Sequence, residues 1–309
     1  MKLKLIETAE KQKTIKKKFS FKGFSLFSGE GVSMTCEPGV ENTGIIFCYK
    51  NVCIPAVAEN IKFVDIHTTA ITKDGVDILT IEHLMAAIWG LGIDNLKIIL
   101  SSNVVPTQDG SAESFVKALL KAKIVDQKEK RQIIIFEKSE TITQPEFENR
   151  YAKFEPYQKL HIECIAPFPQ PIGSHTIIFE EDSKTFLEDI SWSRTFLRSP
   201  IDLNDLTKWN SIRSVFKALP EDPKKSPIIT FTEKEFLTPL KKEDEPARHK
   251  LLDLIGDLAL VGYRIHAKLL ITEPGHKFTH LIAQEIRNEI NLNQNGSQKK
   301  VSQGKILPN

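Results

Sequence analysis

Three ionisable residues in one stretch of the chain are spaced for joint chemistry. His249, Asp253 and Asp257 follow one another at intervals of four residues, which on a helix brings their side chains to one face. An imidazole and a carboxylate in that arrangement can bind the same metal ion. The same spacing is also typical of an ion pair on a helix surface, so this stretch alone leaves both interpretations open.

A second pair, Glu82 and His83, opens another apolar stretch. A glutamate directly before a histidine is typical of metal hydrolases in which the histidine binds zinc and the glutamate takes a proton from water. His83, His249 and Asp253 together would supply two nitrogens and one oxygen. That set suits a catalytic zinc ion with its fourth position open, and the absence of cysteine ligands argues against a closed structural zinc site.

Two further residues are candidates for proton transfer and for binding an oxyanion. His276 follows Gly275 in a predicted loop, where it is either an acid or an ordinary surface histidine. Asp257 is the natural partner to fix its tautomer and raise its pKa. Thr195 offers a hydroxyl that could face an oxyanion, or it simply ends a strand.

The elements that must position these residues are predicted from apolar periodicity and from turn signals. We expect a sheet over 19–54, helices over 80–92 (with Thr80 as its cap), 112–122 and 247–261, and strands over 96–100, 132–136, 160–165 and 264–271. In each half a helix that opens with histidine ends at glycine and leads into a strand. This pattern indicates a weak internal duplication, although such units also arise by chance.

Composition and length indicate an ordinary globular chain. The 309 residues suggest one large domain or two of roughly 150 residues each, and two is the starting hypothesis. We expect a flexible N-terminus at 1–13, α+β domains at 14–126 and 132–290 joined by a charged linker at 127–131, and a disordered tail at 291–309 that is rich in Asn, Gln, Lys and Ser.

Charge and cysteine content exclude several classes of protein. Forty-two Lys and Arg against 40 Asp and Glu leave a net charge of +2, so we expect no nucleic-acid partner. The four cysteines are too sparse for a disulfide framework, and we expect reduced, mostly buried thiols. The N-terminus has no continuous apolar stretch of the length that a signal peptide or a membrane span requires, and no Walker A, dinucleotide or GxSxG motif occurs. We therefore expect a cytoplasmic protein with at most transient contact with a membrane surface. We also expect a monomer.

Taken together, these stretches resemble the zinc-dependent UDP-3-O-acyl-N-acetylglucosamine deacetylases, which act in lipid A synthesis in Gram-negative bacteria. The resemblance extends from about Thr14 to Ile290, and the helix around His249 is its strongest signature. The remaining anchors are Asn42-Thr43-Gly44, Thr80-Ile81-Glu82-His83-Leu84, Gly92-Ile93-Asp94-Asn95, Asp109-Gly110-Ser111-Ala112, Ser193-Arg194-Thr195-Phe196 and Gly275-His276.

The resemblance implies a fold and a role for each candidate residue. The fold would be two similar α+β domains packed as a β-α-α-β sandwich, with the active site at their junction. His83, His249 and Asp253 would bind Zn²⁺. Glu82 would be the general base, Thr195 would bond the oxyanion, and His276, oriented by Asp257, would protonate the leaving amine. Lys250 would assist catalysis nearby, and Lys250 and Phe196 would contact the substrate, UDP-3-O-acyl-N-acetylglucosamine.

Three departures concern the substrate rather than the metal. Phe27 stands where the family usually has a histidine, and Pro106-Thr107-Gln108 replaces the usual Pro-Ile pair. The region from Trp209 to Ile229, comparable to the family's passage for the acyl chain, lacks the usual Gly-Gly-Ser loop. Two alternatives therefore stand beside the deacetylase: a divergent paralogue with a binding role, and a deacetylase of another N-acetylated sugar.

Overall fold

The computed structural model describes residues 1–64, 67–198, 213–214 and 216–303, with backbone alone for 198 and 295–303. Within these residues the chain is a mixed α+β protein, as predicted. The strands are β1 (Leu3–Ile15), β2 (Phe19–Phe24), β3 (Gly31–Pro38), β4 (Ile45–Tyr49), β5 (Val52–Pro55), β6 (Ile61–Lys62), β7 (Ala70–Lys73), β8 (Val76–Leu79), β9 (Leu96–Leu100), β10 (Ile124–Phe136), β11 (Glu140–Thr143), β12 (Tyr151–Pro156), β13 (Leu160–Pro167), β14 (Ser174–Glu180), β15 (Phe196–Arg198), β16 (Ile229–Phe231) and β17 (Arg264–Thr272). The helices are α1 (Glu82–Gly90), α2 (Glu113–Lys121), α3 (Ser183–Thr185), α5 (Glu245–Leu258) and α6 (His276–Gln303), with short helical turns η1 (Ala58–Asn60), η2 (Phe186–Ile190), η3 (Pro223–Lys225) and η4 (Ala259–Val261).

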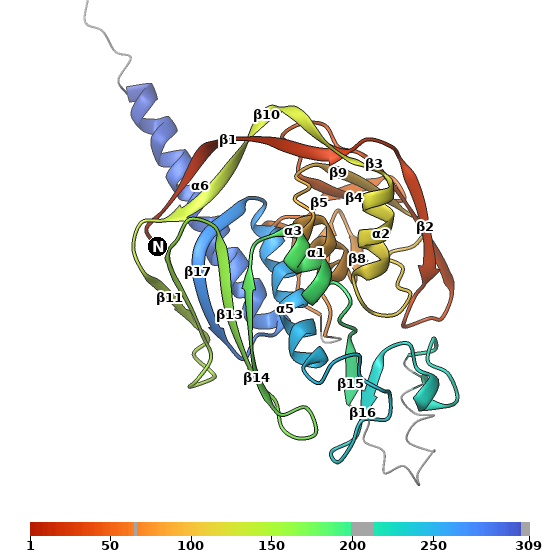
Figure 1. Cartoon of the computed structure of the whole chain (residues 1–309). Helices are drawn as coiled ribbons and strands as arrows, with labels where there is room; N and C mark the ends of the chain where they lie inside the picture. Colours follow the sequence, from red (N-terminus) through yellow and green to blue (C-terminus); the bar gives the residue numbers. More distant parts are fainter. Residues whose placement is uncertain (65–66, 199–212, 215, 304–309) are drawn as a thin grey trace, which may run out of the picture.

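Two large sheets form the outer layers of the molecule (Figure 1). One has the order β2-β3-β9-β4-β5, and alternate residues of β9 are buried, which gives that sheet one apolar face. The other has the order β1-β10-β17-β12-β11, and its β17 also pairs with β13, which pairs with β14. The apolar faces of both sheets contribute to a single core that spans the two halves of the chain.

Helices α1 and α5 pack against each other between these sheets (Figure 1). Their approach is close because Gly256 has no side chain: a Cβ there would lie 2.1 Å from the carbonyl oxygen of Glu82. The helix that opens with Glu82-His83 and the helix that carries His249 and Asp253 are thereby held side by side. His83 on α1 and the pair His249 and Asp253 on α5, far apart in the sequence, are thus close in space.

The predicted units of helix, glycine and strand occur in both halves, and the second unit has a short helical turn before its strand. Helix α1 leads into β9 and α5 leads through η4 into β17, where Gly262 adopts φ +82° at the turn.

The prediction of Thr80 as a helix cap is wrong. Thr80 has φ +61°, α1 begins only at Glu82, and the buried Thr80 hydroxyl has no hydrogen-bond partner among the described residues.

The N-terminus and the charged linker differ from their predictions. Residues 1–13, expected to be flexible, lie largely in β1, and residues 127–131 lie in β10. The two strands pair antiparallel from Leu3 opposite Phe136 to Ile15 opposite Ile124. Lys128, Glu129 and Lys130 are exposed while their backbone groups pair, so the composition of a linker is compatible with a strand. Arg131, the last residue of this segment, is buried.

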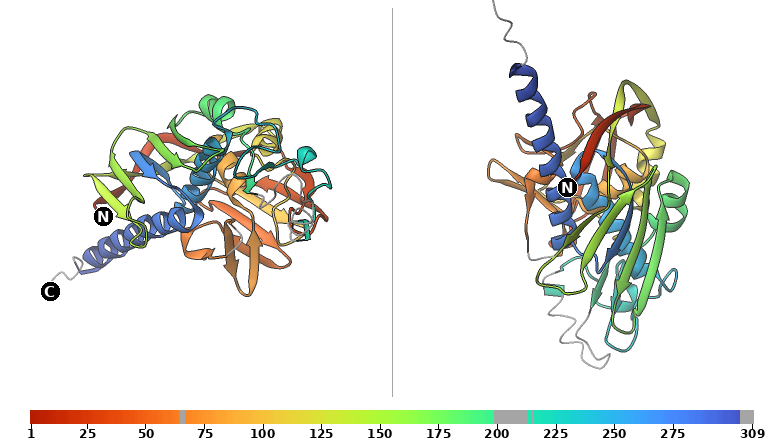
Figure 2. Two further views of the ribbon diagram at one scale, coloured as in Figure 1. Left: turned by 90° about the horizontal axis from the view of Figure 1, so that it is seen from below. Right: turned by 90° about the vertical axis from the view of Figure 1, so that its left-hand side faces the viewer.

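The C-terminal segment also differs from its prediction as a disordered tail from residue 291. Helix α6 continues to Gln303 and projects from the body of the molecule (Figures 1 and 2). Arg287 and Asn291 both donate hydrogen bonds to Glu59, which tie the helix to η1. Residues 304–309 lie outside the described residues. Within the described residues, no helix is long and apolar enough to cross a membrane.

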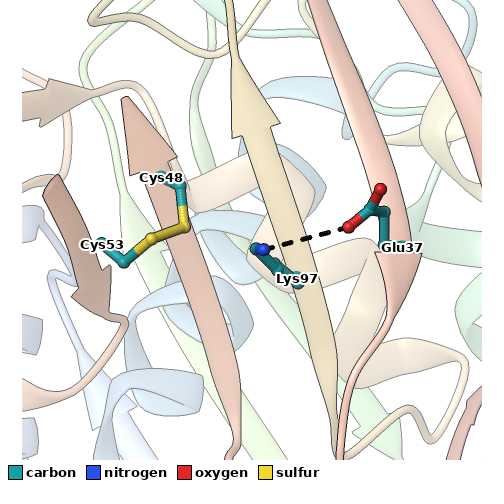
Figure 3. The surroundings of a disulfide bond; sticks show 4 residues. All are labelled: Glu37, Cys48, Cys53 and Lys97. Carbon is teal, nitrogen blue, oxygen red and sulfur yellow. Dashed lines mark ion pairs between the residues drawn. A yellow bond between two sulfur atoms is a disulfide. The ribbon is translucent and has the colours of Figure 1, made fainter. Parts of the chain in front are cut away.

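The cysteines are only partly as predicted. Cys36 and Cys164 are free and buried, but Cys48 and Cys53 form a disulfide between the paired strands β4 and β5 (Figure 3). The two residues are directly opposite each other in the antiparallel register, which a sequence separation of five conceals. The expectation of four reduced thiols is therefore wrong for this pair.

Candidate metal centre and active site

Three predicted ligands meet where α1 lies against α5. His83 is on the first turn of α1, and His249 and Asp253 are one turn apart on α5. Their ligand atoms lie within 4.8 Å of one another, and all three residues are buried. Asp253 Oδ1 lies 3.5 Å from His83 Nε2 and 3.2 Å from His249 Nε2.

Hydrogen bonds around this cluster leave the three atoms available to a cation. The carbonyl oxygen of Ser193 can only accept, so His249 Nδ1 donates to it at 3.1 Å and Nε2 keeps its lone pair. Lys250 donates to Asp253 Oδ2 at 2.7 Å. The other oxygen, Oδ1, is buried without a hydrogen-bond partner among the described residues. An orphaned carboxylate oxygen between two imidazoles fits a bound metal ion.

Charges in the cluster favour the same assignment. Burial opposes the charged form of Asp253, but His249 and Lys250 outweigh it and hold the pKa of that carboxyl well below its usual range. Burial lowers the pKa of His249, which favours the neutral imidazole that a metal needs. For His83, burial is outweighed by Asp253 and Glu82, which raise its pKa. A metal cation would take the place of the proton that this negative environment attracts.

Glu82 lies beside the cluster and has its own supports. Thr68 Oγ1 donates to Glu82 Oε1 at 2.8 Å, and the backbone N–H of Thr69 donates to Oε2 at 3.0 Å. The carboxylate is buried, with 3% of the residue exposed. It is thus fixed next to the metal ligand that follows it in the chain.

His276 and Asp257 are paired, as predicted. His276 Nδ1 lies 2.8 Å from Asp257 Oδ2, and its Nε2 lies 3.7 Å from Asp253 Oδ2. Burial opposes the charged form of His276, but Asp257 and Asp253 outweigh it and raise its pKa to about 9. His276 is the first residue of α6 rather than part of a loop. The loop after β17 is short and ends at Gly275.

Phe196 lies at the edge of the cluster, and Thr195 precedes it in the chain. The Phe196 ring centroid is 6.0 Å from that of His249, and Lys250 Nζ is 5.3 Å from the Phe196 ring centroid. The Thr195 backbone is fixed by an N–H bond to the carbonyl oxygen of Gly110 at 2.8 Å. Arg194, the neighbouring residue, binds the fully buried Glu245 at the start of α5 through Nε and Nη2. The segment that leads into β15 is thereby anchored to the helix that carries two of the ligands.

Sequence reasoning missed three residues of this site. Thr68 and Thr69 hold Glu82, and His280 lies 3.5 Å from Asp257 Oδ1. His280 could have been found, since it follows His276 by one helical turn. The threonines precede a strand and have no local signal.

Comparison with known proteins shows the family of the chain. The family profile described as "LpxC: UDP-3-O-acyl N-acetylglycosamine deacetylase" matches residues 12–288. The chain belongs to the LpxC family. The UDP-3-O-acyl-N-acetylglucosamine deacetylase of a Nitratiruptor species is 35% identical over 284 residues, which covers 90% of this chain and 91% of that protein. The LpxC relative from Campylobacter jejuni (strain 81-176), with the same name, is 32% identical over 301 residues, which covers 95% of this chain and 97% of its own.

Proposed function

We propose that this LpxC-family protein hydrolyses the N-acetyl group of UDP-3-O-acyl-N-acetylglucosamine and releases acetate, a step of lipid A biosynthesis. Family membership over nearly the whole chain supports the reaction. The observation that carries the proposal is the buried group of His83, His249 and Asp253 with its orphaned carboxylate oxygen. Beside it lie a buried carboxylate and a histidine paired with another carboxylate, the groups that amide hydrolysis requires.

We assign Zn²⁺ to His83, His249 and Asp253. When bound, zinc supplies a Lewis acid that polarises the acetamide carbonyl and lowers the pKa of water towards about 7. The supports of the ligands fit this role: Ser193 orients the His249 ring, and Lys250 occupies the oxygen of Asp253 that faces away from the two histidines.

Glu82 is the general base in this proposal. Both of its oxygens accept hydrogen bonds from the Thr68-Thr69 segment, so the carboxylate is oriented before substrate binds. It is adjacent in sequence to a ligand, but it is absent from the group of ligand atoms. Glu82 can therefore take a proton from water without being consumed as a ligand.

The remaining predicted residues act on the developing charges and on the sugar. His276, with a pKa of about 9 raised by Asp257 and Asp253 against the effect of burial, is a cation at neutral pH and can protonate the leaving amine. The hydroxyl of Thr195 donates a hydrogen bond to the oxyanion. Lys250, hydrogen-bonded to Asp253, assists catalysis. Its ammonium group lies over the Phe196 ring, and both residues contact the substrate.

We place the acyl chain near a small apolar cluster that is separate from the main core. Leu219 and Ile228 are buried there, with Leu26, Leu197 and Phe216 packed against them. Phe27, at the position where the family usually has histidine, has its ring 5.5 Å from that of Phe216. Residues 209–212 and 215 of the altered region lie outside the described residues.

The finer fold is part of the proposal. We interpret 14–126 and 132–290 as two similar α+β domains in a β-α-α-β sandwich. The helix–glycine–strand units and the central pair α1 and α5 support this interpretation. The monomeric state stays a prediction. The cytoplasmic location and the transient contact with a membrane surface stay predictions.

Acetate release from UDP-3-O-acyl-N-acetylglucosamine tests the function. The purified protein is assayed as isolated, after chelation, and after zinc is restored. We expect activity that is lost on chelation and recovered with zinc. A folded, zinc-loaded protein that releases no acetate would contradict the proposal and favour another N-acetylated sugar or a binding role.

A further inference from the structure

The hydroxyl of Thr69 lies at the centre of a second polar cluster beside the metal ligands. Thr69 is fully buried. Its Oγ1 lies 2.6 Å from Asp257 Oδ1, 3.1 Å from His276 Nδ1 and 2.9 Å from His280 Nε2. One hydroxyl therefore contacts a carboxylate and two imidazoles from α5 and α6 at once.

The numbers of donors and acceptors around Thr69 Oγ1 fix which atoms carry the protons of its three hydrogen bonds. An ionised carboxylate only accepts, so the single proton of Thr69 goes to Asp257. The two lone pairs of the hydroxyl then accept from the histidines, which requires protons on His276 Nδ1 and His280 Nε2. Asp257 Oδ2 accepts from Thr279 Oγ1 at 2.5 Å and from His276 Nδ1 at 2.8 Å. The result is a saturated network in which the proton on His276 Nδ1 is shared between Asp257 and Thr69.

The backbone of Thr69 serves the opposite side of the site. Its N–H donates to Glu82 Oε2 at 3.0 Å, and its carbonyl oxygen accepts from the N–H of Ile81 at 3.3 Å, just before α1. Thr69 thus contacts the carboxylate assigned as base with its backbone, and the pair assigned as acid with its side chain. A change in its position would alter both.

A metal ion does not fit the second cluster. Asp257, His276 and His280 have ligand atoms close enough to share a cation. The Thr69 hydroxyl already lies within 3.1 Å of one ligand atom of each of the three residues. A cation would have to displace this hydroxyl and leave it buried without partners, which is costly. The cluster is a hydrogen-bond network rather than a second metal site.

We propose that Thr69 is a positioning residue of the deacetylase: its hydroxyl, oriented by His280, locks Asp257 and the Nδ1–H form of His276, while its backbone fixes Glu82. This inference rests on the proposed function for its kinetic consequence. The hydrogen-bond network itself is independent of that function. His280 lies against both Thr69 and Asp257, and its described contacts include neither Glu82 nor a metal ligand.

Replacing Thr69 by valine and by serine tests the role of the hydroxyl. Valine keeps the shape and the backbone N–H, whereas serine keeps the hydroxyl. We expect Thr69→Val to lower kcat by about 10- to 100-fold, with KM and bound zinc within about threefold of the unmodified protein. Thr69→Ser should stay within about threefold of it in kcat. Unchanged kcat in Thr69→Val, or equal loss in both variants, would overturn the proposal.

A ring-nitrogen NMR measurement covers the case in which Thr69→Val does not fold. In the unmodified protein labelled with ¹⁵N-histidine, we expect protons on His280 Nε2 and on His276 Nδ1. A His280 ring protonated on Nδ1 alone would overturn the network. The spectra also separate the two claims, because an unmodified protein that releases no acetate contradicts the proposed function while the proton positions still decide the network.

Discussion

Glu82 and His83 are adjacent in the chain but have separate partners. The Glu82 carboxylate is held by Thr68 and Thr69, whereas the His83 ring faces Asp253 and His249. Because the supports do not overlap, binding of the metal and activation of water can be lost independently. Glu82 and His83 therefore have separate roles, one in activating water and one in binding the metal.

We expect Glu82→Gln to keep bound zinc and to lose about 10²- to 10⁴-fold in kcat, the usual contribution of a general base. Gln keeps the size of the side chain but cannot take the proton. His83→Ala should instead lose zinc and activity together. Zinc content per chain, measured beside acetate release, checks both variants. Near-normal turnover in Glu82→Gln would refute the assigned base.

The cysteines give a second prediction at this scale. Burial raises the pKa of the Cys36 and Cys164 thiols to about 12, so the native protein should react very slowly with a thiol reagent at about pH 8. Denatured without reductant, the chain should show two reactive thiols, and after reduction four. Four thiols before reduction would show that Cys48 and Cys53 are not paired.

At the scale of elements, helix pairing could be predicted only in part. Apolar periodicity predicts the helices around His83 and His249, and their spacing predicts which side chains share a face. The close contact of Gly256 with the Glu82 backbone has no signal in either helix alone, since it depends on how the two pack. The same holds for Thr69, whose partners lie 13, 188, 207 and 211 residues away.

Gly256→Ala should therefore damage stability and activity together. The new Cβ would meet the Glu82 backbone oxygen at 2.1 Å, so α1 must shift away from α5. Overpacking of this kind costs about 1–3 kcal/mol or more. Denaturant unfolding measures the loss, and Gly31→Ala is the matched control because nothing lies within 4 Å of its Cβ position. Equal stability of the two variants would contradict the packing described here.

At the scale of the whole molecule, Arg131 ties the two halves together. From β10 it binds both oxygens of Asp94 and the carbonyl oxygen of Gly92, and it pairs with Glu10 of β1. The Gly92-Ile93-Asp94-Asn95 anchor thus has a structural role. A cavity of about 260 Å³ lies beside this network, and none of the predicted site residues lines it. Neither β1 nor this junction could be predicted, because charged residues in a paired strand look like a linker.

Arg131→Met should lower the free energy of unfolding by about 3 kcal/mol, because it leaves the half-buried Asp94 without its bidentate partner. Lys130→Ala is the control: its ion pair with Glu7 is exposed on both sides and should contribute less than about 1 kcal/mol. Urea unfolding followed by circular dichroism compares the two. A smaller loss for Arg131→Met than for Lys130→Ala would refute the role of this junction.

The central claim is that His83, His249 and Asp253 hold one zinc ion. The most direct test is crystallography of the zinc-loaded protein at the zinc absorption edge, where anomalous scattering locates the metal. We predict one strong peak for a zinc ion bound by His83 Nε2, His249 Nε2 and Asp253. The Thr69 hydroxyl should still donate its hydrogen bond to Asp257. A peak among Asp257, His276 and His280, with none at the predicted ligands, would contradict the account.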